Sequence, residues 1–324
     1  MAERATVYQV VQLGKEVTPG TAVAATRKMA GYQVTPSIRP DVKTYRPSGH
    51  AFPTAAVLNK EWVEADISGP LLYDEMAYWL SGLIKSVSPT GAGTAKTWVW
   101  SPSSTSEDTR KTYTVEVGGS VRAGRFAYGI LSGMNISIDR NEATMGGTLL
   151  ARSYTDGHTM TAALADNTII PVAPPHVLVY LADTEAGLAG ATALGRALRV
   201  QWAYEDALAA AWFLNGQTYH DVTVDQVPNL TAKLRVAADS EGMALLTTMR
   251  SGATKFMRIK AVGALITGSD YYTLQIDTAL KVTEPTPFED ADGIYALEWT
   301  MQGAHDATSG WATEITLINA LATL

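Results

Sequence analysis

The stretch VVQLGKEVTPGTAVAATRKMA, residues 10–30, decides the fold. Its opening apolar run predicts a strand over Val7–Leu13, and the glycines and proline that follow predict a turn. The glycines, lysine and threonines invite comparison with a phosphate-binding loop, but that loop needs its lysine directly after the second glycine. Here Lys15 follows the first glycine, and Glu16 stands where the magnesium-binding hydroxyl belongs. The stretch is therefore predicted to be structural.

The same pattern recurs 167 residues later as VLVYLADTEAGLAGATALGRA, residues 177–197. At this shift Glu16 falls on Asp183 and Gly20 on Gly187. Further along, YRPSG ending at Gly49 falls on WFLNG ending at Gly216. With the shift reduced to 144, residues 115–138 align with residues 259–282. A pattern that repeats over this length predicts a tandem duplication, with domains at residues 1–160 and 161–324.

Each half predicts the same elements in the same order. A strand (Gly31–Arg39 or Leu198–Tyr204) leads into a long polar excursion, from which a strand returns to Ile67 or Val236. One helix follows: LLYDEMAYWLSGLI, starting near Ser68 or Pro70, or SEGMALLTTM, capped by Asp239 or Ser240. The remainder alternates with period two. The fold class is therefore mainly β with some α, as two tandem β-sandwich or open-barrel domains, each with one flanking helix.

Composition bounds the function classes. The chain has 324 residues, 46% hydrophobic and 18% charged, which is typical of a globular protein. It has no cysteine, no apolar run long enough for a membrane span and no apolar signal core at its N-terminus, so we expect assembly in a cytoplasm and no membrane partner. Residues 1–160 carry 16 basic and 14 acidic side chains, for +2, and residues 161–324 carry 9 and 18, for −9. A net charge of −7 argues against a protein that binds nucleic acid tightly through its phosphates.

Catalytic and metal-binding motifs are missing from the sequence. The five histidines are isolated, and HExxH, GxSxG and GxGxxG do not occur. We therefore expect no catalytic residues, no metal ligands and no cofactor. The eight tryptophans and fourteen tyrosines leave one alternative open, a carbohydrate-binding or enzymatic β-sandwich protein with an aromatic platform.

The run QLGKEVTPGTAVAATRKMAGYQVTPSIRP, residues 12–40, followed by YRPSG and a strand reaching ISGPLLYDEMAYWL, resembles the tail tube (major tail) proteins of siphophages. Their xGxExxxGTxxAA arm is matched by Gly14, Glu16, Gly20, Thr21, Ala24 and Ala25. The resemblance covers residues 8–155 well and residues 175–320 only through the internal repeat. Two fused domains depart from the single-domain pattern of that family.

The resemblance implies a structural virion protein without enzymatic activity. Such proteins self-assemble into stacked rings that form a hollow tube for DNA ejection. Two domains per chain would make each ring a trimer with pseudo-hexameric symmetry. The implied partners are further copies of the chain, the tape measure protein, tail terminator and tip proteins, and double-stranded DNA in passage. The implied location is the virion tail, after assembly in the host bacterial cytoplasm.

The same resemblance implies which segments make contacts between chains. The excursions Arg39–Trp62 and Tyr204–Asn229 are expected to stack on a neighbouring ring, and the arm Val7–Ala25 to cross to another subunit. The candidate contact residues are Gly14, Glu16, Gly20, Thr21, Arg39, Tyr45, Arg46, Gly49, Trp62, Trp212 and Gly216.

Overall fold

A computed structural model describes residues 8–119 and 121–324. The chain is mainly β with few helices, which confirms the predicted fold class. The first half contains β1 (Val10–Lys15), β2 (Arg27–Met29), β3 (Gln33–Tyr45), β4 (Ala55–Pro70), α1 (Met76–Leu83), β5 (Lys96–Trp100), β6 (Tyr113–Gly118), β7 (Ala123–Asp139), β8 (Ala143–Ala151) and β9 (Tyr154–Asp156). The second half contains η2 (Pro174–His176), β10 (Val177–Ala182), η3 (Ala186–Ala189), β11 (Ala197–Glu205), β12 (Leu208–Ala211), β13 (Val222–Asp225), β14 (Asn229–Ala237), α2 (Ser240–Met243), α3 (Leu245–Ser251), β15 (Thr254–Thr267), β16 (Asp270–Pro285), β17 (Glu289–Ala291), β18 (Ile294–Gly303) and β19 (Thr313–Asn319). The first predicted strand is found as β1, and Val7 lies outside the described residues.

The two halves have the same strand order. In the first half antiparallel pairing runs β1–β6–β7–β8–β4–β3, and β9 lies beside the first residues of β7. In the second half it runs β10–β15–β16–β18–β14–β11, and β19 lies beside the first part of β16. The register also shifts at equivalent points of this order, between Leu131 and Gly133 on β7 and between Val282 and Glu284 on β16, so equivalent residues of these two strands lie 151 positions apart and not the 144 that the sequence alignment predicts. The six strands of the first order thus have counterparts, in the same sequence, in the second half.

The halves are joined by strand pairing at two places. At the first, which we call the seam, β7 pairs with β11 from Asp139↔Arg199 to Met134↔Tyr204. At the second, β5 pairs with β19, and the buried Asn319 side chain accepts a hydrogen bond from Trp98 Nε1 at 3.0 Å. Both halves contribute to one main hydrophobic cluster, which includes Trp79, Trp100, Trp202 and Trp299. The continuous sheet and the shared cluster hold the halves together.

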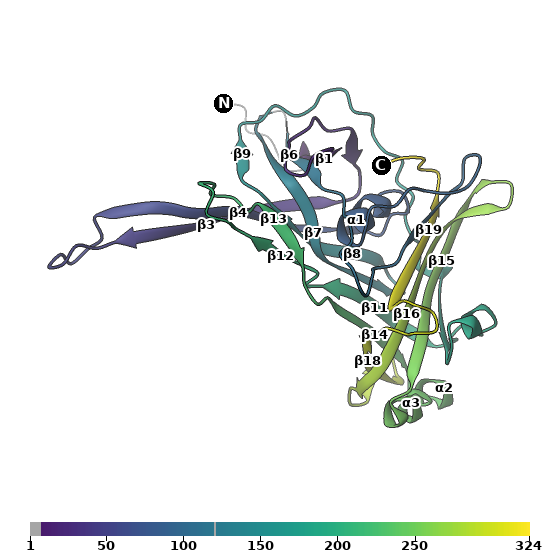
Figure 1. Ribbon diagram of the computed structural model, residues 1–324. Coiled ribbons are helices and arrows are strands. Elements are labelled where there is room, and N and C mark those ends of the chain that lie inside the picture. Colours follow the sequence, from purple (N-terminus) through teal and green to yellow (C-terminus); the bar gives the residue numbers. More distant parts are fainter. Residues whose placement is uncertain (1–7, 120) are drawn as a thin grey trace.

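The helices occupy the predicted segments, with two corrections: α1 starts later than expected, and the single helix predicted over SEGMALLTTM is divided into α2 and α3. Every residue of α1 is buried, in the middle of the molecule (Figure 1). The expected start near Ser68 or Pro70 is wrong, because β4 continues through Pro70 and the chain turns before the helix begins at Met76. In the second half the Asp239 side chain caps α2 by accepting hydrogen bonds from the N–H groups of Glu241 and Gly242, as predicted.

Both polar excursions form β-hairpins. The first, β3 with β4, is long and projects far from the body, whereas the second, β12 with β13, lies against the base of the first (Figure 1). Gly49 and Gly216 stand in the two hairpin turns with left-handed φ values of 79° and 81°, a conformation that favours glycine. The repeat in the sequence aligned these two glycines. Among the residues that the structure describes, no helix has both the length and the apolar content to cross a membrane.

Candidate functional site

The predicted arm is held on its own chain by the carboxylate of Glu16. Glu16 is buried and accepts hydrogen bonds from the Gly20 N–H at 2.7 Å, the Thr112 hydroxyl at 2.8 Å, the Thr114 hydroxyl at 2.9 Å and the Tyr128 N–H at 2.9 Å. These contacts tie the turn after β1 to β6 and β7. Glu16 is therefore an internal anchor of the chain in this structure.

The arm glycines are required by close packing within the same chain. A Cβ atom on Gly14 would lie 2.5 Å from the carbonyl oxygen of Ala24, and one on Gly20 would lie 2.0 Å from Arg152 Nη1. Gly20 also has a left-handed φ of 82°. Thr21, by contrast, is exposed. Of the four candidate contact residues in the arm, Thr21 has the exposure that a contact with another chain needs.

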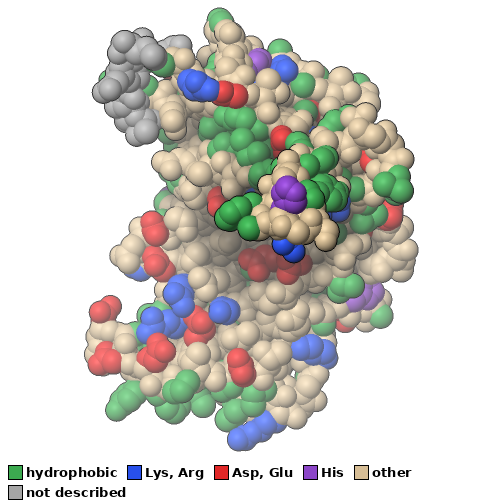
Figure 2. Space-filling model, turned by 90° about the vertical axis from the view of Figure 1, so that its left-hand side faces the viewer, with side chains coloured by type: hydrophobic (Ala, Val, Ile, Leu, Met, Phe, Trp, Pro, Cys, Tyr) green, Lys and Arg blue, Asp and Glu red, His purple; other side chains and the backbone are tan. Residues whose placement is uncertain are grey.

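The projecting hairpin presents apolar side chains to solvent. Seen end-on, it carries hydrophobic side chains beyond the body (Figure 2). The exposed ones are Ile38, Val42, Tyr45, Phe52, Val57 and Leu58. At its base Arg39 is paired with Glu64 at 2.9 Å, and in its turn Arg46 Nη1 donates to the carbonyl of His50 at 2.6 Å. A monomer gains no stability from apolar residues in this position, so they indicate a surface for another molecule.

The second hairpin docks on the first half through Arg152. The Arg152 guanidinium donates to the carbonyls of His220 at 3.0 Å and Asp221 at 2.6 Å, and it lies over the Tyr128 ring at 4.6 Å. Nearby, Trp212 packs edge-on against Trp62 with ring centroids 5.6 Å apart. The candidate residues Trp62 and Trp212 are thus brought together, half-buried, where the two hairpins meet.

His220 is the least expected member of this contact. It is fully buried, its ring lies edge-on to Tyr128, and neither ring nitrogen has a hydrogen-bond partner among the described residues. Burial, with the positive charge of Arg152 beside it, lowers the pKa of His220 to about 4. The sequence shows this histidine only as isolated from the other four, and its neighbours Arg152 and Tyr128 come from segments that are distant in the chain.

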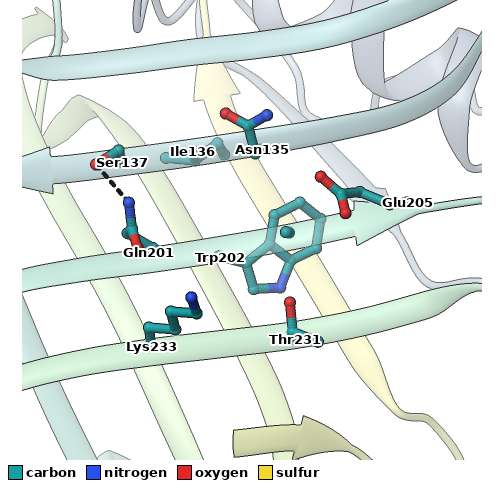
Figure 3. A pocket seen from close by; sticks show the side chains of 9 residues that line it. Asn135, Ile136, Ser137, Gln201, Trp202, Glu205, Thr231 and Lys233 are labelled. Carbon is teal, nitrogen blue, oxygen red and sulfur yellow. Dashed lines mark hydrogen bonds between the residues drawn. The ribbon is translucent and has the colours of Figure 1, made fainter. Parts of the chain in front are cut away.

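A polar face extends across the seam on the side of the sheet away from the core. Side chains alternate along each strand: Ile136 and Trp202 are buried, and Asn135, Ser137 and Gln201 point to the other face (Figure 3). Gln201 Nε2 donates to Ser137 Oγ at 3.4 Å across the seam. This face continues onto β14 through Thr231 and Lys233 (Figure 3).

Charges on this polar face are mixed and largely acidic near the base of the projecting hairpin. A hollow there includes Asp66, Glu205 and Asp206, and acidic side chains are visible beneath the hairpin (Figure 2). Lys233 supplies a positive charge on the neighbouring part of the face, beside Arg199 and Arg235. Both arginines are paired with carboxylates, Arg199 with Glu298 and Arg235 with Glu289, so the described part of this face carries mixed charges.

Two features of the described residues bear on the alternative of a carbohydrate-binding or enzymatic β-sandwich protein. Within residues 8–119 and 121–324, no group of three or more His, Asp or Glu side chains is placed to hold a metal ion. In the same ranges no tryptophan is exposed, and the exposed aromatic rings that could stack on a sugar include tyrosines such as Tyr45 and Tyr295.

Comparison with known proteins identifies a family. The family model described as "Phage tail tube protein" matches residues 9–301, which is most of the chain. No curated protein matches the chain.

Proposed function

This chain belongs to the phage tail tube protein family, and from that premise we propose that it assembles into stacked rings whose central bore conducts double-stranded DNA during ejection. The family makes it a structural component of the virion tail. The finer steps, namely ring formation, stacking and DNA passage, are what we propose for this chain.

The observation that carries the proposal is the common strand order of the two halves, together with their edge-to-edge pairing at the seam. A sheet that already joins two equivalent units can add further units in the same manner, and a closed ring leaves no strand edge unpaired. Three chains would supply six units, giving a threefold ring with pseudo-sixfold symmetry. The common order also supports a tandem duplication with its boundary near residues 160 and 161.

Charge favours the same arrangement. With +2 on residues 1–160 and −9 on residues 161–324, alternation of the halves around a ring places unlike neighbours side by side. We also propose that the tail is of the siphophage type, with a tape measure protein inside the tube and terminator and tip proteins at its ends. Assembly would take place in the host bacterial cytoplasm.

Stacking is assigned in this proposal to the projecting hairpin. Its tip extends beyond the body and exposes apolar side chains such as Tyr45 and Phe52, which a neighbouring ring would cover. Trp62 and Trp212 would set the direction of the hairpin from its base, since they pack together there. Thr21 on the arm, with Arg39, Arg46 and the two tip glycines, completes the proposed contacts between chains.

The bore is assigned to the polar face across the seam. A strongly positive lining would retain DNA through its phosphates, and release during ejection requires the reverse. The mixed face, with Asp66 and Glu205 beside Lys233, fits a surface over which DNA slides.

Negative-stain electron microscopy of the purified chain over a range of concentrations tests the proposal. We expect threefold rings that stack into hollow tubes as the concentration rises. A chain that stays monomeric at every concentration, with no ring or tube in any field, would contradict it. Sedimentation velocity on the same samples would give the mass of the smallest closed species, which separates a trimer of chains from a hexamer.

A further inference from the structure

The described part of the chain has several open strand edges, and two of them belong to β3 and to the segment that runs from the end of β16 through β17. Over residues 33–41 the described structure pairs β3 with β4 alone, on one side. Over residues 282–291 it pairs the end of β16 and the short β17 with β18 alone. Each open edge carries an exposed apolar side chain, Ile38 on the first and Phe288 on the second. Open edges of this kind are sites where another chain can add.

The seam provides a template for what such an addition would look like. The Asp139 N–H donates to the Glu142 carbonyl, on the β8 side, so the backbone groups of Met134, Ile136 and Ile138 face β11. In the seam register these three residues oppose Tyr204, Trp202 and Val200. These are the pairs that exchange backbone hydrogen bonds.

The open edges are the counterparts of the two seam strands. Val34 of β3 is paired with Ile67 of β4, and in the second half Val200 of β11 is paired with Leu234 of β14. Val34 is therefore the counterpart of Val200. Two and four residues further along, Pro36 is the counterpart of Trp202 and Ile38 that of Tyr204. On the other edge, the register shift shared by β7 and β16 puts Pro285 in the place of Met134.

The next position on the second edge is also a proline. Thr286 donates its N–H to the Glu298 carbonyl, on the β18 side, so the backbone at Pro285 and Pro287 faces the open side. Thr286 is the counterpart of Asn135, so Pro287 follows it as Ile136 follows Asn135; Phe288 is then an extra residue before the Glu289↔Ala296 pair, the counterpart of Ser137↔Thr144. Both open edges therefore carry prolines at positions whose seam counterparts supply backbone N–H donors.

We propose that β3 of one chain pairs antiparallel with residues 285–291 of a second copy in the register of the seam, and that Pro36, Pro285 and Pro287 leave this joint with fewer hydrogen bonds than the seam. Proline has no N–H to donate. The contact between chains is thereby weaker than the contact between halves, and free chains are protected from uncontrolled addition at their edges. This inference rests on the proposed self-assembly of the chain.

A cysteine pair tests the register. Thr35 and Glu289 are the counterparts of Gln201 and Ser137, which oppose each other across the seam. Such a pair, outside the hydrogen-bonded positions, has Cα atoms about 4.5 Å apart, which suits a disulfide. The natural chain has no cysteine. Thr35→Cys with Glu289→Cys should give disulfides between chains and covalent closed trimers when assembled chains are oxidised.

Two further variants serve as controls. Gln201→Cys with Ser137→Cys should form a disulfide within one chain, and Thr35→Cys with Asp290→Cys should form none, because successive side chains of a strand point to opposite faces. Rings visible by electron microscopy without the 35–289 disulfide would overturn the register and leave the proposed function standing. Absence of any ring in the natural chain would overturn the proposed function and this inference with it.

A proline exchange tests the hydrogen-bond deficit. Pro36→Val with Pro287→Ile restores one N–H on each edge, and each restored bond should lower the concentration needed for assembly about fivefold. Pro40→Val is the matched control, because Pro40 lies on the same strand beyond the proposed overlap. Thermal unfolding of the variants at low concentration would show that each chain is folded. An assembly threshold that does not fall in the double variant would overturn the role of the prolines.

Discussion

The carboxylate of Glu16 accepts a hydrogen bond from the backbone N–H of Tyr128 at 2.9 Å, and Tyr128 has a left-handed φ of 61°. A residue other than glycine in this conformation costs on the order of 1–3 kcal/mol and persists only where its surroundings hold it. Glu16 also accepts hydrogen bonds from Gly20, Thr112 and Thr114. One buried acceptor thus fixes both the turn of the arm and the unusual backbone of β7.

Replacement of Glu16 by glutamine should lower the free energy of unfolding by about 2–4 kcal/mol. The NH2 group of the glutamine would stand in place of a carboxylate oxygen, and as a donor it cannot accept the hydrogen bonds that this oxygen now receives. Urea denaturation of the purified chain measures this. Asp183→Asn is the matched control: the repeat aligns Asp183 with Glu16, but its side chain is 83% exposed, in an ion pair with Lys255. That change should cost less than about 0.5 kcal/mol. Equal losses in the two variants would contradict the anchoring role.

The sequence alone predicted those features that depend on residues close together along the chain. The Asp239 cap, the alternating strands and the two hairpin glycines follow from local backbone requirements. The predicted start of α1 was wrong because β4 continues through Pro70, where it is still paired with β8. The contact of Arg152 with His220 could not be predicted, since it joins segments 68 residues apart. Aligning Glu16 with Asp183 gave no sign that one is buried and the other exposed.

Asn319 should prove important for the second joint between the halves. It is fully buried, accepts from Trp98 Nε1 at 3.0 Å and donates to the Tyr73 carbonyl at 3.2 Å. Asn319→Ala leaves both partners buried without their hydrogen bond, and it should destabilise the chain by about 2–4 kcal/mol in urea denaturation. Thr316→Ala on the same strand, at a half-buried position, should cost well under half as much. A small loss for Asn319→Ala would mean that the joint depends on apolar packing alone.

Acid should weaken the docking of the second hairpin through His220. Its pKa is about 4 in the folded chain, because of burial and the charge of Arg152, against an ordinary value of 6.5. The unfolded chain therefore takes up the proton first. The contribution of neutral His220 is complete above pH 6.5 and is lost as the pH falls from 6.5 towards 4.

At pH 5 this linkage should remove about 2 kcal/mol of stability relative to pH 7. His220→Phe keeps an aromatic ring between Tyr128 and Trp212 but cannot be protonated. The difference in unfolding free energy between pH 7 and pH 5 should therefore be smaller by that amount in the variant. Equal pH dependence in the two proteins would assign the acid sensitivity to other groups.

Tube formation should be separable from ring formation at the projecting hairpin. Tyr45 and Phe52 are 59% and 79% exposed, so replacing both by serine removes apolar surface that only another molecule could cover. Electron microscopy of Tyr45→Ser with Phe52→Ser should therefore find rings that no longer stack into tubes, while thermal unfolding of the isolated chain stays unchanged. Val121→Thr is the matched control, since Val121 is equally exposed at 59% but lies on the body between β6 and β7. Its rings should stack normally. Full-length tubes from the serine variant would assign stacking to a different surface, and loss of the rings themselves would place the tip of the hairpin, and not only its base, in the joint within a ring.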